Sequence, residues 1–327
     1  MKALVLESVG TLRVGERAEP EAVVGQVLVA PAYVGVCGTD LHIVDGLHPR
    51  ATFPLILGHE IVGVVADGPS AGSAVVVDPT ISCGGCSACL LGLEHVCEKL
   101  RLVGIDRDGG LAERVLVDET KLHAVPQRLE LEAAALAEPL AVAVHAVRRS
   151  RLEAGCRVVV CGGGPIGLLT VLVAQAAGAS CVLVEPASAR REGARRLGVD
   201  AVADADEVPR RLGGKADVAF DAAAVAPVGL MMPTLVRPGG VVVVEAVYSA
   251  PVPVDLQQVT FREISLVGTR VYTPSDIDDA LDLLVRGVVD AASVVSEIVV
   301  FDGVAGALEG LRQGDSLKVL VDCTGTR

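Results

Sequence analysis

Four cysteines, Cys83, Cys86, Cys89 and Cys97, are close enough in the sequence to bind one metal ion. Two-residue gaps let three thiolates surround a single tetrahedral Zn²⁺, and a longer return supplies the fourth ligand. Two disulfides or four unrelated thiols are the alternatives, and the expected cytosolic character of the chain disfavours disulfides. The spacing therefore predicts a structural zinc lobe over residues 83–97, in which four thiolates leave the metal no open position.

A glycine motif, Gly162-x-Gly164-x-x-Gly167, follows an expected strand and opens an expected helix in VVVCGGGPIGLL. In that context it predicts a dinucleotide site, with Pro165 and Ile166 between the second and third glycines. The first two glycines let backbone amides approach a pyrophosphate at the helix N-terminus, and the third lets the helix pack on the sheet.

Glu185 follows the next expected strand, near the offset of about 20 residues at which an acid binds the adenosine ribose. An acid at this place repels a 2′-phosphate, so NAD is favoured over NADP. Arg190 and Arg191 lie close enough in sequence to keep NADP as the alternative. A solvated turn carboxylate is the other interpretation of Glu185.

Composition limits the classes of function. A chain of 327 residues exceeds the usual size of one core, and 51% hydrophobic with 21% charged residues is typical of a globular protein. The net charge of −13 disfavours nucleic acid and anionic membranes as partners. The start, MKALVLESVG, resembles neither a signal peptide nor an anchor, and apolar stretches fall short of the ~18 residues that span a bilayer. A cytoplasmic protein is expected.

The expected secondary structure changes along the chain. Up to about residue 140 it consists of short strands broken by Gly and Pro, such as QVLVAPAYVGV and HEIVGVV, which predicts an all-β region. From about residue 150, strands alternate with helices, which predicts a doubly wound parallel sheet. From about residue 269, helix and strand mix again. The fold class is therefore α/β, with two domains and one interruption.

These motifs resemble the zinc-dependent medium-chain dehydrogenase/reductases, the alcohol and polyol dehydrogenase family, over essentially the whole chain. The resemblance rests on VCGTDLH (36–42), LGHEIVG (57–63), the cysteine lobe, AEPLAVAVHAV (137–147), the glycine motif, VRPGG (236–240) and LVGTRVYT (266–273). The segments GTDLH and EPLAVAVHA are similar to those of the sorbitol, threonine and butanediol dehydrogenase branch. The resemblance implies a GroES-like β-barrel catalytic domain over 1–141, a Rossmann NAD-binding domain over 142–268, and a return to the catalytic domain over 269–327.

One departure from the family pattern lies between Gly63 and Val75. The family usually has a longer stretch there that ends in a Gly-Asp-Arg-Val turn, whereas ADGPSAGSA joins the two expected strands directly. The short loop removes no metal ligand, but it puts the local barrel geometry in doubt.

The resemblance implies a catalytic zinc held by Cys37 and His59, with Glu60 and Glu138 as the remaining candidates. One thiolate, one imidazole and one or two carboxylates leave an open position, which a catalytic zinc needs for water or an alcohol. Glu60 and Glu138 can each ligate the metal or hold its water, and the sequence does not choose. A buried free thiol is the alternative for Cys37, and a helix-start carboxylate is the alternative for Glu138. Two zinc ions per chain are expected.

The implied reaction is hydride transfer from a secondary alcohol, diol, polyol or amino alcohol to NAD⁺. Zinc lowers the pKa of a hydroxyl, after which the carbon-bound hydrogen passes to the nicotinamide. The resemblance assigns a proton relay from Thr39, through the nicotinamide ribose, to His42, with Asp40 orienting the loop. A surface or core histidine is the alternative for His42. The other histidines, His48 among them, are expected to be structural.

Two other classes share part of this pattern. A zinc-free quinone or enoyl reductase of the same superfamily shares the glycine motif and the barrel, but has no reason to keep the zinc residues. A non-catalytic zinc-ribbon protein explains only the four cysteines and lacks the expected basic face. The specific substrate, and the choice between a homodimer and a homotetramer, stay open.

Overall fold

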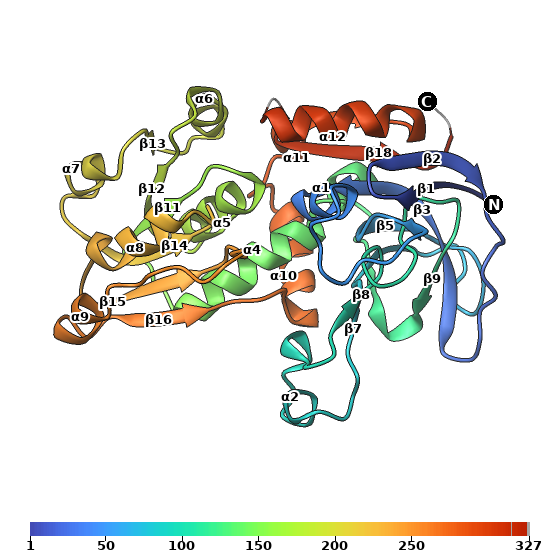
Figure 1. The fold of residues 1–327 in the computed structure, drawn as a ribbon, viewed down its shortest axis with the longest axis horizontal. Helices are drawn as coiled ribbons and strands as arrows, with labels where there is room; N and C mark the ends of the chain where they lie inside the picture. The colour runs from blue at the N-terminus through green and yellow to red at the C-terminus, as the bar shows by residue number, and fades with distance from the viewer. Residues whose placement is uncertain (315, 326–327) are drawn as a thin grey trace. The chain divides into compact units, whose positions relative to one another are not determined.

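The computed structural model describes residues 1–314 and 316–325. They fall into two compact units, whose strands and helices are shown in Figure 1. Unit 1 comprises Met1–Glu138 together with Thr273–Arg327, and unit 2 comprises Pro139–Tyr272.

Unit 1 consists mainly of short strands. They are β1 (Lys2–Ser8), β2 (Thr11–Glu16), β3 (Gln26–Val36), β4 (Leu55–Ile56), β5 (Glu60–Val65), β6 (Ala74–Val77), β7 (Thr80–Ile81), β8 (Arg101–Leu102), β9 (Val115–Asp118), β10 (Leu122–Ala124), β17 (Val295–Val299) and β18 (Lys318–Asp322). Seven form a sheet in the order β10-β6-β5-β3-β18-β17, with β9 also paired to β3. A second sheet has the order β2-β1-β4, and β7 pairs with β8. Among the described strands the pairing does not close into a ring, so the expected barrel is an open mixed sheet.

Strand β3 is the central strand of the larger sheet and pairs with β5, β9 and β18. It accommodates Pro31 at a register shift against β5, where no ladder hydrogen bond from that residue is needed. The antiparallel pairing of β18 with β3 places Val319 opposite Val36. The C-terminal strand therefore lies beside the segment that leads into Cys37.

The short loop after Gly63 forms a regular connection. Strands β5 and β6 pair in unbroken antiparallel register from Ile61 opposite Val77 to Val64 opposite Ala74. The loop between them is closed by backbone hydrogen bonds, and its Asp67 accepts a 2.7 Å hydrogen bond from the N–H of Leu28. The shortened loop thus leaves the pairing of these strands intact.

Helices of unit 1 are short. They are α1 (Gly38–Val44), α2 (Ser87–Leu90), α3 (Leu131–Ala134), α10 (Pro274–Val285), α11 (Ala291–Val294) and α12 (Val304–Gln313), with the 3₁₀ turns η1 (Glu94–Val96), η2 (Glu119–Lys121) and η4 (Phe301–Gly303). Helix α4 (Ala137–Ser150) carries the chain into unit 2. Helix α2 and η1 belong to the cysteine segment, which extends from the β7–β8 pair (Figure 1).

Unit 2 contains a six-stranded parallel sheet in the order β13-β12-β11-β14-β15-β16, which confirms the expected Rossmann sheet. Its strands are β11 (Arg157–Cys161), β12 (Ser180–Val184), β13 (Ala201–Val202), β14 (Ala216–Asp221), β15 (Val236–Val244) and β16 (Ser265–Gly268); its helices are α5 (Pro165–Ala176), α6 (Ser188–Arg196), η3 (Ala205–Glu207), α7 (Val208–Leu212), α8 (Ala226–Leu235) and α9 (Leu256–Phe261). The strand order reverses between β11 and β14. In such sheets a ligand binds outside the carboxyl ends of the strands at that point.

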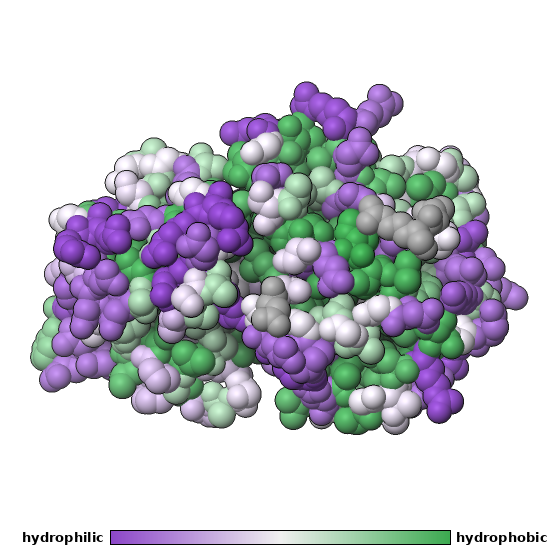
Figure 2. Space-filling view, turned by 90° about the horizontal axis from the view of Figure 1, so that it is seen from above, coloured by the Kyte–Doolittle hydropathy of each residue, from purple (hydrophilic) through white to green (hydrophobic). Residues whose placement is uncertain are grey.

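Figure 2 shows one face, on which hydrophobic and hydrophilic residues are interspersed. Isolated exposed apolar residues are normal for a folded protein. None of the described helices is long and apolar enough to cross a membrane.

Candidate functional site

Cys37 lies at the junction of β3 and α1, where its position is held by the backbone. The carboxylate of Asp40 accepts a 2.8 Å hydrogen bond from the N–H of Cys37, and the N–H of Asp40 donates to the Cys37 carbonyl at 3.0 Å. The Asp40 carboxylate at the N–H of Cys37, and the Cys37 side chain at the N–H of Asp40, form a capping box, which provides partners for amides of the first helical turn. The Cys37 thiol is therefore presented from a fixed helix start.

The structure brings Cys37, His59 and Glu60 together. One ligand atom from each residue lies within 4.8 Å of the others, and both His59 and Glu60 are at least 95% buried. Strand pairing accounts for this, because Glu60 begins β5 directly opposite Gly35 of β3. A thiolate, an imidazole and a carboxylate at this separation fit the donor set that Zn²⁺ prefers.

The electrostatics of this cluster also favour a cation. Burial opposes protonation of His59, but Asp40, Cys37 and Glu138 overcome it and hold the pKa of His59 well above its usual value. Burial raises the pKa of Asp40, while His59 and the N–H of Cys37 act in the opposite direction. The Nδ1 of His59 and Oδ1 of Asp40 are 3.8 Å apart, and both are buried without a hydrogen-bond partner in the part of the chain that the structure describes. Buried polar atoms in that state point to a missing partner.

Lys318 is a residue of this cluster that the motifs did not reveal. Its side chain is 3% exposed, and its Nζ pairs with the carboxylate of Glu60 and donates to the carbonyl of Val36 at 3.3 Å. Burial opposes the charge of Lys318, but Glu60 and Cys37 raise its pKa. The one sequence signal is a lysine at the start of the apolar strand KVLVD, where a solvent-facing side chain is the ordinary expectation.

Gly35 allows the close approach of Glu60. A Cβ built on Gly35 would lie 1.8 Å from Oε2 of Glu60, and its backbone φ is not in the left-handed region. The requirement for glycine is therefore steric. Any side chain at this position would displace the Glu60 carboxylate from Cys37 and Lys318.

The remaining catalytic candidates lie around the cluster. Glu138 is 6% exposed in the first turn of α4 and acts electrostatically on His59 and Lys318, but it lies outside the tight group of three. Thr39 Oγ1 is 3.8 Å from the sulfur of Cys37, and His42 is exposed near the end of α1.

His48, which the sequence placed among structural histidines, is within electrostatic reach of this region. Burial and the charge of Arg50 are the main causes that lower the pKa of His48, and His42 and His59 contribute further. No sequence motif marked this proximity.

The four lobe cysteines also converge. Their sulfur atoms all lie within 4.8 Å of one another, with 3.5 Å between Cys86 and Cys89 and 3.8 Å between Cys86 and Cys97. The sulfur of Cys97 accepts N–H groups from Cys83 and Lys99, each at 3.3 Å. The N–H groups of Cys89 and Glu98 lower the pKa of Cys86 to about 6. Burial and the thiols of Cys86 and Cys97 instead raise the pKa of Cys89 to about 12. A thiol that amides stabilise as a thiolate, as at Cys86, is suited to a tetrahedral metal site.

The glycine motif forms the turn between β11 and α5. Gly162 follows β11 with φ of +106°, which favours glycine, and Pro165 occupies the first turn of α5 after the N-cap Gly164. A Cβ on Gly167 would lie 1.9 Å from the Gly162 carbonyl. Ile166 lies between them in the same first turn. The N-terminus of a twelve-residue helix therefore opens onto the strand ends, as an anion site requires.

Glu185 directly follows β12 and faces this turn. Its Oε2 accepts the N–H of Gly163 at 2.7 Å, and its Oε1 accepts the N–H of Ala187 at 2.8 Å. Arg190 approaches the carboxylate at 3.9 Å, whereas Arg191 donates to the carbonyls of Glu185 and Pro186. The acid is thus fixed in position, and Arg191 is engaged with the backbone.

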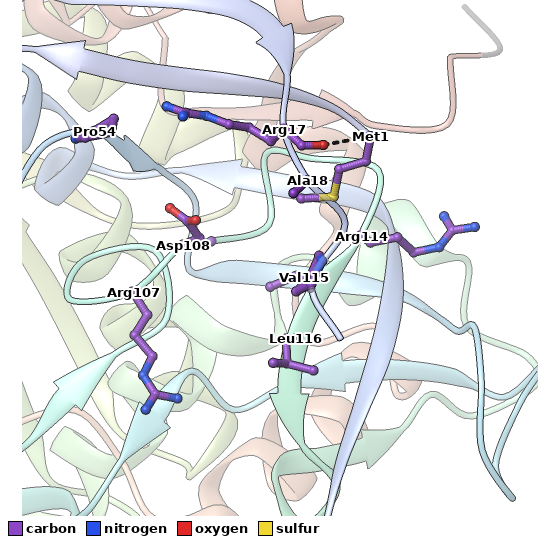
Figure 3. Close-up of a pocket in the computed structure, with 11 residues that line it drawn as sticks. Met1, Arg17, Ala18, Pro54, Arg107, Asp108, Arg114, Val115 and Leu116 are labelled. Carbon is purple, nitrogen blue, oxygen red and sulfur yellow. Dashed lines mark hydrogen bonds between the residues drawn. The ribbon is translucent and has the colours of Figure 1, made fainter. Parts of the chain in front are cut away.

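A separate surface cavity of about 450 Å³ lies in unit 1 and shares no residue with these groups. Met1, Arg17, Arg107, Asp108 and Arg114 are among the residues that line it. Figure 3 shows that the three guanidinium groups point away from one another. They do not converge on a common anion, so this cavity is not assigned to the reaction.

Two families of known proteins match the chain. The alcohol dehydrogenase GroES-like domain matches residues 24–127, and the zinc-binding dehydrogenase family matches residues 165–286. The 2-dehydro-3-deoxy-L-galactonate 5-dehydrogenase of Pseudoalteromonas atlantica is 39% identical over 325 residues, covering 94% of each chain. The sorbitol dehydrogenase of Halalkalibacterium halodurans is 32% identical over 340 residues, covering 98% of this chain and 99% of that protein.

Solved structures give the same result. The RspB alcohol dehydrogenase of E. coli, complexed with NADH, superposes with a TM-score of 0.92 at 27% identity, covering 98% of this chain and 99% of the other. A zinc-binding dehydrogenase from Sinorhizobium meliloti bound to NADP has a TM-score of 0.91 at 33% identity, covering 98% of each. The resemblance read from the motifs is confirmed: this chain belongs to the zinc-binding alcohol dehydrogenase family and is an oxidoreductase.

Proposed function

We propose that the protein oxidises a secondary hydroxyl of a small polyol or sugar acid and transfers the hydride to NAD⁺. The observation that carries this proposal is the convergence of the half-buried Cys37 with the buried His59 and Glu60 in a chain of this family. The sugar-acid class is supported by the relative named 2-dehydro-3-deoxy-L-galactonate 5-dehydrogenase, and the polyol class by the relative named sorbitol dehydrogenase.

Two zinc ions per chain are part of the proposal. Cys37, His59 and Glu60 would hold the catalytic zinc, with Glu138 as a fourth candidate, and the four lobe cysteines would hold the structural zinc. The catalytic zinc would supply Lewis acidity toward the reacting hydroxyl. Asp40 orients the ligand loop through the N–H of Cys37, and Lys318 balances the charge of Glu60.

A substrate panel with metal analysis tests the function. The protein, assayed with NAD⁺ against aldonic acids, polyols, vicinal diols and amino alcohols, should oxidise at least one of the first two classes, with about two zinc ions per chain. A metal-free protein that reduces quinones or enones would instead be the zinc-free reductase. One zinc ion per chain with no turnover would indicate a non-catalytic protein that binds zinc only in the cysteine lobe.

The proton relay is proposed to run from Thr39 through the nicotinamide ribose to His42. His42→Ala should slow oxidation on the order of 10²-fold or somewhat less at pH 6–7, where few solvent bases are available, and less at high pH. The zinc content should not change. The pH–rate profiles of the variant and the wild type are compared; superimposable profiles would make His42 a structural residue.

NAD is proposed as the preferred cofactor because Glu185 is fixed where it would meet the adenosine ribose. Its carboxylate would repel a 2′-phosphate, so kcat/KM should be higher with NAD than with NADP. Glu185→Ala should lower the ratio of kcat/KM with NAD to kcat/KM with NADP by about tenfold, the order expected for one lost charge–charge repulsion. A wild-type preference for NADP would contradict the assignment and would make Arg190 the phosphate partner.

The domain limits 1–141, 142–268 and 269–327 are proposed as the catalytic domain, the cofactor domain and the catalytic return, supported by the two compact units. A homodimer or homotetramer is proposed, since β16 is an edge strand of the sheet of unit 2 and Phe261, at the end of the preceding helix α9, is 79% exposed. The molecular mass in solution tests the oligomeric state.

The nine free cysteines support a reducing, cytoplasmic compartment, and subcellular fractionation tests this location.

A further inference from the structure

Three acids lie at the carboxyl ends of strands in the parallel sheet of unit 2. Glu185 follows β12, Asp221 ends β14, and Glu245 follows β15. The sheet places all three on the edge where the strand order reverses, which is the edge at which a dinucleotide binds. A bound pyrophosphate would add negative charge to this edge.

The three acids differ in the hydrogen bonds that their carboxyl oxygens accept. Glu185 accepts one backbone N–H on each oxygen, and Asp221 accepts the hydroxyl of Tyr248 and the N–H of Ala223. Glu245 accepts the hydroxyl of Thr170, at 3.0 Å to Oε2. Among the described residues its buried Oε1 has no hydrogen-bond partner.

An ionised Glu245 would therefore be poorly stabilised. Burial raises the pKa of Glu245 to about 8; the hydroxyl of Thr170 opposes the shift, and the charge of Asp221 adds to it. Thr170 on α5 and Asp221 on β14 are the groups that act on it from the packed elements. Near Asp221, burial raises the pKa of Cys161 to about 12 and that of Tyr248 further, so both stay neutral around pH 8.

Glu245 is connected to the glycine turn through a single helix. Thr170, its hydrogen-bond partner, lies in α5, and the N-terminus of α5 is the proposed pyrophosphate site. A neutral carboxyl beneath this helix leaves the positive end of the helix dipole intact. A carboxylate in the same place would repel a bound pyrophosphate in a medium of low dielectric constant.

We propose that Glu245 links cofactor affinity to proton binding, so that the protein holds its dinucleotide when Glu245 is neutral and loses affinity when Glu245 ionises. This proposal rests on the dinucleotide site of the proposed function. Linkage is reciprocal, so dinucleotide binding above neutral pH takes up a proton.

Calorimetric titration with NAD⁺ at pH 6.5 and 9.5 tests the proposal. The Kd of the wild type should rise about tenfold between the two pH values, the order that one added charge imposes at a partly buried site. The Kd of Glu245→Gln should change less than twofold. Glu153→Gln removes an exposed carboxylate before the amino end of β11 and should behave as the wild type.

Thr170→Val provides a second variant in case Glu245→Gln folds poorly. Without the hydroxyl that stabilises the carboxylate, the loss of affinity should begin at a higher pH than in the wild type. Equal pH dependence in wild type, Glu245→Gln and Thr170→Val would overturn the inference alone. Absence of NAD⁺ binding at every pH, with a folded protein, would overturn the proposed function as well.

Discussion

Cys37→Ala is expected to abolish alcohol oxidation while leaving the fold intact. Cys37 is half-buried at a helix start that is held by backbone contacts of Asp40, so its sulfur contributes little packing. If that sulfur is a catalytic zinc ligand, kcat should fall by more than about 10³-fold, because the metal supplies several kcal/mol of charge stabilisation. Bound zinc should decrease from about two to about one per chain.

Cys156→Ala is the matched control for this experiment. Cys156 is also a half-buried thiol, but it precedes β11 in unit 2 and belongs to neither cysteine group that could bind a metal. The control should retain activity and zinc. Circular dichroism of both variants should match the wild type. Full activity with two zinc ions in Cys37→Ala would show that the catalytic metal site lies elsewhere.

Replacement of Cys89 should impair stability, whereas Cys37→Ala should impair activity. The loss of one lobe thiolate should release the structural zinc and destabilise residues 83–97, since structural zinc contributes directly to folding. Limited proteolysis of that segment distinguishes this defect from the loss of chemistry in Cys37→Ala.

The second large effect is expected for Lys318→Met. Lys318 and Glu60 are 3% and 1% exposed, so removal of the ammonium leaves a carboxylate buried without its counter-ion. Breaking a buried pair in this way costs about 3–5 kcal/mol of unfolding free energy. Urea unfolding measures this loss, and the midpoint should shift while the slope stays the same.

Two further variants separate the charge from the packing. Glu60→Gln combined with Lys318→Met should recover part of the lost stability, because it removes the unpaired charge. Lys2→Met, at an exposed lysine of β1, should change the unfolding free energy by less than about 0.5 kcal/mol. Equal stability of Lys318→Met and the wild type would show that Lys318 is not the counter-ion on which the Glu60 carboxylate depends.

Several local features could be predicted from the sequence because their causes are local. Strand β3 begins and ends where the apolar run QVLVAPAYVGV does, and α5 begins at the proline after the glycine turn. The lobe cysteines converge because short gaps in a chain with turn-forming glycines bring them together. The parallel sheet of unit 2 followed from alternating strands and helices. The barrel did not follow, since closure depends on strand shear and tilt rather than on any one strand.

Other features depend on pairs of residues that are distant in the sequence. Lys318 reaches Glu60 because β18 pairs with β3, and 258 residues separate the two. Glu245 follows an apolar strand and by its type belongs in solvent, but its Oε1 is buried and its Oε2 accepts the hydroxyl of Thr170 on α5. Charge and residue type alone favour solvation for both side chains.

The sequence by itself determined the family, the order of strands and helices, and the residues whose types suit zinc and a dinucleotide. Short-range spacing and apolar periodicity are properties of the amino-acid order, so they can be recognised from the sequence. Only the tertiary structure decided that Glu60 is paired with Lys318, that Gly35 leaves space for the Glu60 carboxylate, and that burial raises the pKa of Glu245. The physical reason is that burial and counter-charges depend on which strands become neighbours, and these control whether an acid is a ligand, an ion pair or a neutral group.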